Sequence, residues 1–252
     1  MNPRQAEIVD LLARGGAVAV QELAGRFGVS SMTVRRDLDA LEHEGAVVRT
    51  HGGAMLTRTR TVEFAFAARA ERRGPAKRAI AAEVRRSIRP GMSVCLDTGT
   101  TTMEVARAIA GLRGIKVLTA SLAVSAVLYA QDGIELVMLG GVARKGSPDL
   151  YGEITEENVK RFRVNLAVIG ADAASAEGIF AADQTMNRVT RAMIAAADEV
   201  MLVIDSSKFG GTAFRKYADW DEIDTVVTDD EAPVAVRKWL NRCAGKVRYV
   251  QG

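Results

Sequence analysis

This chain of 252 residues has few of the residues that build covalent or metal frameworks. It contains only two cysteines and two histidines, and Cys95 lies within an apolar stretch, so we expect neither a disulfide framework nor a zinc or haem site. No cofactor or metal is therefore expected, and a reducing compartment is favoured. The chain also lacks a run of about 18 apolar residues and the apolar core of a signal peptide, which predicts a cytoplasmic protein with no membrane partner.

An excess of one charge is equally absent. Lys and Arg number 34 against 31 Asp and Glu, a formal charge of +3, which permits a nucleic-acid partner without requiring one. Because 48% of the residues are hydrophobic, the chain can form one small and one medium domain, each with its own core. The placement of charges, rather than their sum, must therefore indicate function.

The stretch Val20–Ala54 has the pattern of a helix, a short turn, a second helix and a β-hairpin. The first, amphipathic helix starts near Val20 and stops at Gly28. The hairpin runs from Ala46 through a turn at His51-Gly52-Gly53 and returns to Leu56, which predicts a wing that carries Arg49 and His51. This order of elements is typical of a winged helix-turn-helix that enters a DNA groove.

The second helix has one apolar and one exposed side. Val34, Leu38 and Leu41 recur at i, i+4 and i+7 and form a stripe that must pack inward. A rotation of about 100° per residue places Arg36 nearly opposite this stripe and Arg35 on its flank. Ser30 or Ser31 is expected to cap the helix, whose free N–H groups suit phosphate oxygens. The candidate DNA-binding residues are Ser30, Ser31, Met32, Thr33, Arg35, Arg36, Arg49 and His51.

These segments resemble the DeoR family of bacterial transcriptional repressors. The resemblance lies in Val29–Leu38, Leu41–Gly45 and Arg49–Ala54. It implies a repressor that dissociates from DNA when it binds a phosphorylated sugar or related metabolite. The alternative is a small helical packing module whose arginines are merely solvated. Their position near the start of the helix, ahead of its acidic residues, favours DNA binding.

Three regions are expected: a winged helix-turn-helix domain at 1–57, a basic linker at 58–75 and an effector domain at 76–252. In the last, short apolar runs alternate with helical patterns, which predicts a mainly parallel α/β sheet. Strands are expected at Met92–Leu96, Ile115–Leu118, Ile134–Leu139, Asn165–Ile169, Val200–Ile204 and Thr225–Val227. Helices are expected near Lys77–Ser87, Thr101–Ala110, Leu122–Ala130, Thr155–Arg161, Asp183–Ala196 and Pro233–Arg242.

Polar or glycine clusters follow several of these strands, and in an open α/β sheet the crevice beyond such strand ends binds ligands. In Asp97–Thr102, a glycine and three threonines at a helix start offer amides, hydroxyls and a dipole to phosphate, unless the threonines simply cap the helix. Asp97 itself would repel phosphate, so it is expected to bind sugar hydroxyls or hold the loop. The candidate effector-binding residues are Lys77, Asp97, Gly99, Thr100, Thr101, Thr102, Ser121, Gly141, Asp172 and Lys208, the two lysines neutralising the phosphate.

This second half also resembles the DeoR C-terminal sensor domain, which is similar in fold to ribose-5-phosphate isomerase. The resemblance lies in Lys77 with Ala79–Ala81, Asp97–Thr101, Thr119–Leu122, Gly140-Gly141, Gly170–Asp172 and Asp205–Phe209. The chain departs from the family at Gln184–Asn187, where an acidic pair is often found, so the family's effector preference is not carried over.

The leading hypothesis is a repressor of a carbohydrate-metabolism operon, not an enzyme. It would bind double-stranded operator DNA as a homodimer or homotetramer and respond to a phosphorylated sugar. An activator would use the same DNA contacts. The other alternative is a sugar-phosphate isomerase-like enzyme with an appended DNA-binding domain, using Asp97, Asp172, Asp183 and Lys208 as acid–base groups. A kinase phosphate loop at Gly141–Ser147 fails, because Ser147 stands where the lysine is required.

Overall fold

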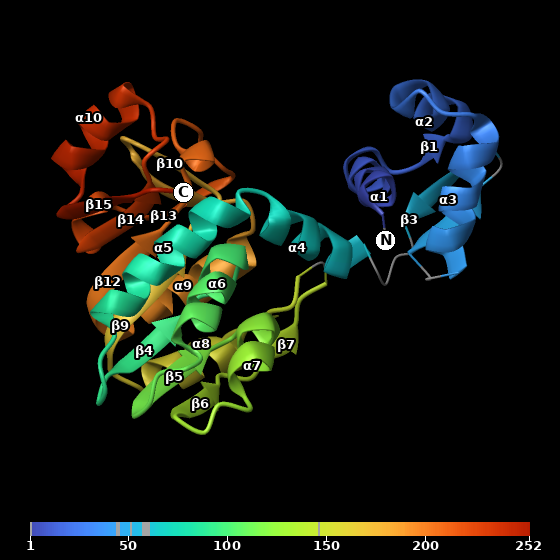
Figure 1. The fold of residues 1–252 in the computed structure, drawn as a ribbon. Coiled ribbons are helices and arrows are strands. Elements are labelled where there is room, and N and C mark those ends of the chain that lie inside the picture. Colours follow the sequence, from blue (N-terminus) through green and yellow to red (C-terminus); the bar gives the residue numbers. More distant parts are fainter. Residues whose placement is uncertain (1, 44–45, 51, 57–60, 146) are drawn as a thin grey trace. The chain divides into compact units, whose positions relative to one another are not determined.

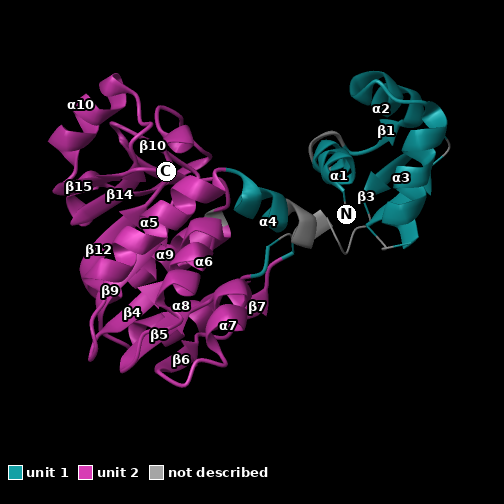
Figure 2. Cartoon of the chain, viewed as in Figure 1, with its two compact units in different colours: residues 1–72, 145–148 teal, residues 73–144, 149–252 magenta. Residues whose placement is uncertain are grey.

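The computed structural model describes residues 2–43, 46–50, 52–56, 61–145 and 147–252. The chain divides into two compact units, one of residues 1–72 with 145–148 and one of residues 73–144 with 149–252 (Figure 2). The larger division therefore falls between Arg72 and Arg73, near the end of the segment predicted as a linker.

The first unit combines helices with a small antiparallel sheet (Figure 1). Its elements are α1 (Pro3–Gly15), β1 (Val18–Ala19), α2 (Val20–Phe27), α3 (Ser31–His43), β2 (Val47–Thr50), β3 (Gly53–Leu56) and α4 (Thr61–Glu71). The predicted winged helix-turn-helix is confirmed, since β2 and β3 pair as an antiparallel hairpin after α2 and α3. The sequence did not predict β1, which pairs with β3. Nor did it predict that α4 makes most of the 58–75 segment helical.

Local chemistry explains where these helices begin and end. Gly28 adopts a left-handed conformation, with φ of 62°, and ends α2. Of the two serines proposed as the cap of α3, Ser30 takes that role, because its hydroxyl accepts a hydrogen bond from the Thr33 amide at 3.1 Å. The predicted stripe of Val34, Leu38 and Leu41 is fully buried. The apolar pattern of α3 therefore fixes which side of the helix remains exposed.

The second unit is built around a seven-stranded parallel sheet. Its first elements are α5 (Gly74–Ser87), β4 (Ser93–Leu96), α6 (Thr100–Ile109), β5 (Ile115–Thr119), α7 (Leu122–Leu128), β6 (Ile134–Met138), β7 (Val142–Ala143), β8 (Leu150–Tyr151), α8 (Glu153–Lys160) and β9 (Val164–Gly170). The elements that follow are β10 (Ala173–Ser175), β11 (Gly178–Ala181), α9 (Gln184–Ala196), β12 (Ala197–Val203), η1 (Ser206–Lys208), β13 (Arg215–Ala218), η2 (Trp220–Glu222), β14 (Thr225–Asp229), α10 (Val234–Cys243) and β15 (Lys246–Val250). The predicted parallel α/β class is confirmed, and the predicted strands and helices are found within a few residues of their expected bounds.

The order of strands is β15-β14-β12-β9-β4-β5-β6. From β4 the chain adds β5 and β6 on one side, and then returns to place β9 on the other side of β4. The point where the order reverses therefore lies between β4 and β9. In open α/β sheets, ligands bind beyond the carboxyl ends of the strands at such a point.

Helices cover both faces of the sheet, as the alternation within a strand shows. In β4, Val94 and Leu96 pack on one face with α5, α6 and α7, the near face in Figure 1, whereas Cys95 packs on the other with α8, α9 and α10. Three features were not predicted: the edge strand β15, the small antiparallel sheet β10-β11-β13 and the β7-β8 pair. The last two lie beside the strand ends that form the candidate effector site.

Candidate functional site

The exposed side of α3 presents two arginines. Arg35 and Arg36 are exposed, and within the described ranges neither side chain makes an ion pair or hydrogen bond. Ser31 and Met32 lie exposed in the same first turn, the Met32 side chain being 56% accessible. The start of α3 therefore offers two uncompensated guanidinium groups close to free backbone N–H groups, an arrangement that suits phosphate oxygens.

A buried carboxylate joins α3 to α1. Asp37 is only 5% exposed, and it accepts a hydrogen bond from Arg4 Nε at 2.6 Å. Gln5 Nε2 approaches the same carboxylate at 3.4 Å. The hydrogen bond with Asp37 raises the pKa of Arg4 above its usual value, against the opposing effect of burial. This contact, which the sequence did not predict, fixes α3 against α1.

The wing is tied to α3 by Arg49. Its Nη1 donates to Asp39 Oδ1 at 2.9 Å and to the Arg35 carbonyl at 3.4 Å. Arg49 thus has partners within the unit, unlike Arg35 and Arg36. The other wing residue that was predicted to contact DNA, His51, lies outside the described residues.

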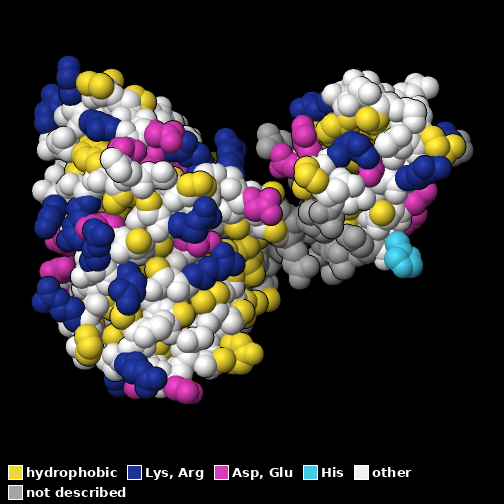
Figure 3. All heavy atoms as spheres, viewed as in Figure 1, with side chains coloured by type: hydrophobic (Ala, Val, Ile, Leu, Met, Phe, Trp, Pro, Cys, Tyr) yellow, Lys and Arg dark blue, Asp and Glu magenta, His cyan; other side chains and the backbone are white. Residues whose placement is uncertain are grey.

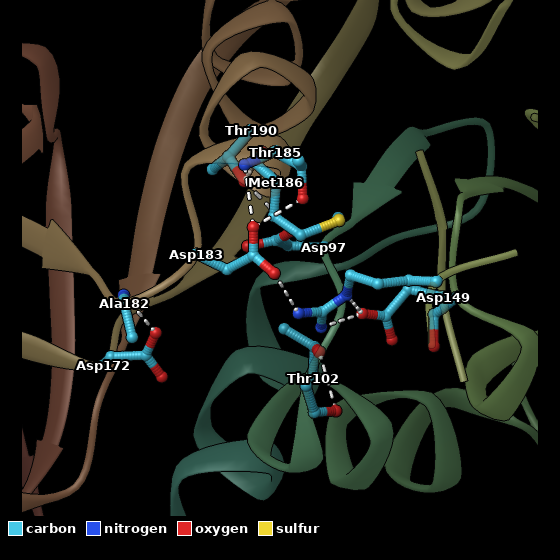
Figure 4. Close-up of polar contacts among 12 residues, drawn as sticks. Asp97, Thr102, Asp149, Asp172, Ala182, Asp183, Thr185, Met186 and Thr190 are labelled. Carbon is cyan, nitrogen blue, oxygen red and sulfur yellow. Dashed lines mark hydrogen bonds and ion pairs between the residues drawn. The ribbon is translucent and has the colours of Figure 1, made fainter. Parts of the chain in front are cut away.

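In the second unit, Asp97 lies at the reversal point of the sheet. It follows β4, and its Oδ2 accepts a hydrogen bond at 3.2 Å from the amide of Gly170, the last residue of β9. Thr190 of α9 donates to the other carboxylate oxygen at 3.4 Å (Figure 4). Burial raises the pKa of Asp97 to about 6, with a further contribution from the charge of Asp149, although these hydrogen bonds oppose the shift. Asp97 therefore joins the segment after β4 to the end of β9 and to α9, and holding its loop was one of the two roles expected for it.

The helix start beside Asp97 has no side-chain cap. Gly99, with φ of 131°, is the N-cap residue of α6, and no side-chain hydrogen bond caps this end. Thr102 Oγ1 instead donates to the Gly99 carbonyl at 3.1 Å. Thr101 and Thr102 are buried, whereas Thr100 is half-buried. The threonines therefore do not act as the cap, and the first amides of α6 keep the free N–H groups that an anion can bind.

Arg144 joins the two sides of this region, a connection that the sequence did not predict (Figure 4). Its Nε and Nη2 contact the fully buried Asp149, the first at 2.9 Å, and its Nη1 contacts Asp183 Oδ2 at 2.9 Å. Burial opposes the charge of Arg144, but the two carboxylates raise its pKa overall. Asp183 also caps α9 by accepting from the Thr185 amide at 2.8 Å. One guanidinium thus connects the segment between β7 and β8 with the start of α9.

The other predicted effector residues have structural partners. Ser121 caps α7 through the Val124 amide at 3.2 Å. A Cβ on Gly141 would lie 2.0 Å from Thr155 Oγ1, so packing alone requires glycine there. Lys77 is buried in α5.

Two further candidates act as supports in their own loops. Asp172 accepts from the Ala182 amide at 2.8 Å and lies apart from Asp97 and Asp149 in Figure 4. Lys208 Nζ donates to the Ala171 carbonyl at 2.5 Å. The residues proposed as acid–base groups in the enzyme hypothesis, Asp97, Asp172, Asp183 and Lys208, therefore each hold part of the fold.

Among the described residues, no group of three or more His, Cys, Asp or Glu side chains is arranged to hold a metal ion. No helix in the same ranges combines the length and the apolar character needed to span a bilayer.

Comparison with known proteins gives matches to both units. Residues 4–60 match the family described as DeoR-like helix-turn-helix domain, and residues 73–230 match the DeoR C terminal sensor domain. A putative aga operon transcriptional repressor of Escherichia coli O157:H7 is 32% identical over 98% of this chain and 93% of its own length. The glycerol-3-phosphate regulon repressor of Escherichia coli K12 is 31% identical, covering 94% of each chain. The HTH-type transcriptional repressor GlcR of Bacillus subtilis is 33% identical, covering 90% of this chain and 87% of its own.

Solved structures give weaker matches. Ribose 5-phosphate isomerase A from Methanocaldococcus jannaschii aligns over 54% of this chain and 55% of its own, at 18% identity and a TM-score of 0.41. Isomerases of this kind are thus among the neighbours, as the family resemblance implied. A likeness of this extent carries no argument about activity.

Proposed function

Because this chain belongs to the DeoR family of transcriptional regulators, we propose that it is a repressor that binds operator DNA through α3 and the wing. The observation that carries the proposal is the placement of two exposed arginines whose side chains make no ion pair or hydrogen bond with the described residues: Arg36 opposite the buried side of α3 and Arg35 on its flank. Since operators of such proteins pair half-sites with a two-fold protein, the active form is a homodimer or homotetramer in the cytoplasm.

The proposal also includes the small molecule that controls DNA binding. The relatives include repressors named for the glycerol-3-phosphate regulon and the aga operon, which supports a phosphorylated sugar or related metabolite as effector and a carbohydrate-metabolism operon as target. The effector binds beyond the carboxyl ends of β4 and β9, beside the hydrogen-bonded pair of Asp97 and Gly170, where the uncapped start of α6 receives its phosphate. Residues 1–57 act as the DNA-binding domain, 58–75 as the linker and 76–252 as the sensor.

The DNA-binding part is tested by removing both arginines. In Arg35→Ala/Arg36→Ala, we expect operator affinity to fall by roughly 100-fold, because each phosphate or base contact of an arginine contributes about 1–3 kcal/mol. Fluorescence anisotropy on the chain's own promoter DNA measures this at a fixed salt concentration. The matched control is Arg85→Ala/Arg89→Ala, which removes two exposed arginines from the second unit and should keep the affinity. Equal loss in both variants, or no loss in the first, contradicts the assignment.

The effector part is tested separately, by thermal shift with a panel of sugar phosphates. A ligand stabilises the state that it binds, so a true effector raises the melting temperature and, added to the protein–operator complex, releases the DNA. A sugar phosphate that is instead converted to product supports the enzyme hypothesis. If none of the panel changes either measurement, the proposed effector class is wrong, while DNA binding is judged by the arginine variants alone.

A further inference from the structure

The second unit contains a cavity whose lining residues do not include Asp97, Gly99 or Thr100. It has a volume of about 480 Å³ and is formed by α8, α9 and β13. A volume of this size holds a small metabolite. Five cationic side chains line it, which are Lys160, Arg188, Arg191, Arg215 and Lys216. We call it the α8–α9 cavity.

The charges of this cavity are only loosely compensated. Four of the five cations have carboxylate partners: Arg188 pairs with Glu156 at 2.9 Å, Lys160 with Glu157 at 2.6 Å, Arg191 with Glu222 and Lys216 with Asp219. The four cationic side chains are between 42% and 72% exposed. Exposed pairs of this kind contribute little and exchange readily. Of the partner carboxylates, only Glu156 lines the cavity. Arg215 makes no ion pair with any described residue.

A buried amide with no partner lies in the wall of the same cavity. Asn187 is 3% exposed, and both its Nδ2 and its Oδ1 lack a hydrogen-bond partner within the described protein. Buried polar groups are almost always hydrogen-bonded, because leaving one unpaired is unfavourable. The donor and acceptor of Asn187 therefore call for a ligand that carries both an oxygen acceptor and a hydroxyl donor.

From these two independent observations we propose that the α8–α9 cavity is a second anion site. It takes a small phosphorylated metabolite with at least two negative charges and a hydroxyl group. The cations bind the charged groups. Asn187, whose amide atoms are covered in this structure, rotates its side chain to exchange hydrogen bonds with the hydroxyl and an anionic oxygen. This proposal does not depend on DNA binding or on the effector assigned to the crevice.

Shared elements connect the two sites. Asn187 and Arg191 of α9 line the cavity, and Thr190, nearly one helical turn after Asn187, donates to Asp97. Tyr217 also lines the cavity, and its hydroxyl donates to the carbonyl of Gly170, whose amide binds Asp97. A ligand in the α8–α9 cavity therefore contacts α9 directly and is connected to the end of β9 through Tyr217.

Calorimetric titration of the full chain with 3-phosphoglycerate and with pyrophosphate tests the site, and glycerol serves as the uncharged comparison. We expect saturable binding of 3-phosphoglycerate that weakens by about tenfold in Arg188→Gln/Arg215→Gln and by a similar factor in Asn187→Leu, as the loss of charge-assisted or buried hydrogen bonds predicts. The matched control, Arg85→Gln/Arg89→Gln, should bind within about twofold of the parent. Asn187→Leu removes an unpaired polar group, so its melting temperature without ligand should not fall.

Four outcomes overturn the proposal. The first is that neither anion binds saturably. The second is binding that is unchanged in both cavity variants, which places the ligand in the crevice or elsewhere. The third is an equal loss in the control, which indicates attraction to overall charge only. The fourth is a loss of operator affinity in Arg188→Gln/Arg215→Gln without small-anion binding, which assigns the surface to DNA instead.

Discussion

The two candidate sites of this chain use their charges in opposite ways. On α3, Arg35 and Arg36 project into solvent without partners in the described structure. At the strand ends, Arg144 is held by Asp149 and Asp183. The first surface is ready for a polyanion as it stands. In the second, an anion that approaches Arg144 has to compete with two carboxylates, so its binding must rearrange contacts among β7, β8 and α9.

The largest effect is expected from a substitution on the buried side of α3, because the exposed arginines of this helix keep their positions only while the first unit stays folded. Leu38→Ala leaves a cavity at a fully buried position, with an expected cost of about 4 kcal/mol. A unit of this size is only marginally stable, so the first unit should unfold and operator binding should disappear, while the second unit keeps its own transition. Calorimetric melting monitors both units.

The control for this variant is Met55→Ala, which truncates a side chain that is 42% exposed in the same unit and should change melting little. If Leu38→Ala instead shifts the transition of the second unit by the same amount, the two units do not unfold independently and the comparison fails.

The internal pairing in the second site is tested by Arg144→Gln. This change takes the guanidinium away from the fully buried Asp149, and we expect a loss of about 3 kcal/mol in the free energy of unfolding, because removing the charged partner of a buried carboxylate is strongly destabilising. Urea unfolding measures the loss, and Arg144→Gln/Asp149→Asn should recover part of it. Arg163→Gln breaks an exposed pair with Asp198 and should cost less than about 0.5 kcal/mol. If Arg144→Gln and Arg163→Gln lowered the free energy of unfolding equally, the buried pair would be no more important for stability than the exposed one, contrary to this expectation.

The smallest expected effect is a pH dependence from Asp97. Its folded-state pKa of about 6 lies above the ordinary value of 3.8, so between these values the folded state binds more protons than the unfolded state. Stability should therefore fall as the pH rises from about 4 to 6. At about 1.4 kcal/mol per pKa unit the whole shift corresponds to about 3 kcal/mol, of which about 2 kcal/mol is lost in this pH range.

Urea unfolding across this pH range checks the effect. In Asp97→Asn this part of the slope should vanish, whatever the absolute stability of the variant. Asp132→Asn, which removes an exposed carboxyl, controls for the loss of one charge. A slope that persists in Asp97→Asn shows that another group is responsible.

Features that depend on local periodicity could be predicted from the sequence. The spacing of Val34, Leu38 and Leu41 fixes the buried side of α3, and Gly28 marks the end of α2 because few other residues accept its left-handed conformation. Six of the seven strands of the parallel sheet were equally predictable, since burial on both faces makes them continuous apolar runs.

Features that depend on long-range pairing could not be predicted. Arg144 and Asp183 are 39 positions apart, and no spacing rule connects them before the fold is known. Asp37 lies between apolar positions of α3, but it is charged, as surface residues usually are. Its burial can be recognised only from the structure, in which Arg4 lies beside it. The edge strand β15 was missed because Lys246–Val250 is half-polar and lies at the margin of the sheet. For the strand-end site, the sequence located the loops but not the salt bridges between them.

The contact between Arg4 and Asp37 constrains anyone who wishes to retarget this regulator. Replacing α3 with the recognition helix of another protein would remove the buried Asp37 and leave Arg4, more than 30 positions upstream, without this carboxylate. The new helix would then pack less firmly against α1, even if every side chain that contacts DNA bases were correctly chosen. Asn2, Arg4 and Gln5 should therefore travel with the graft as one cassette, and purification tags belong at the opposite terminus, clear of the Asn2–Gln5 capping box.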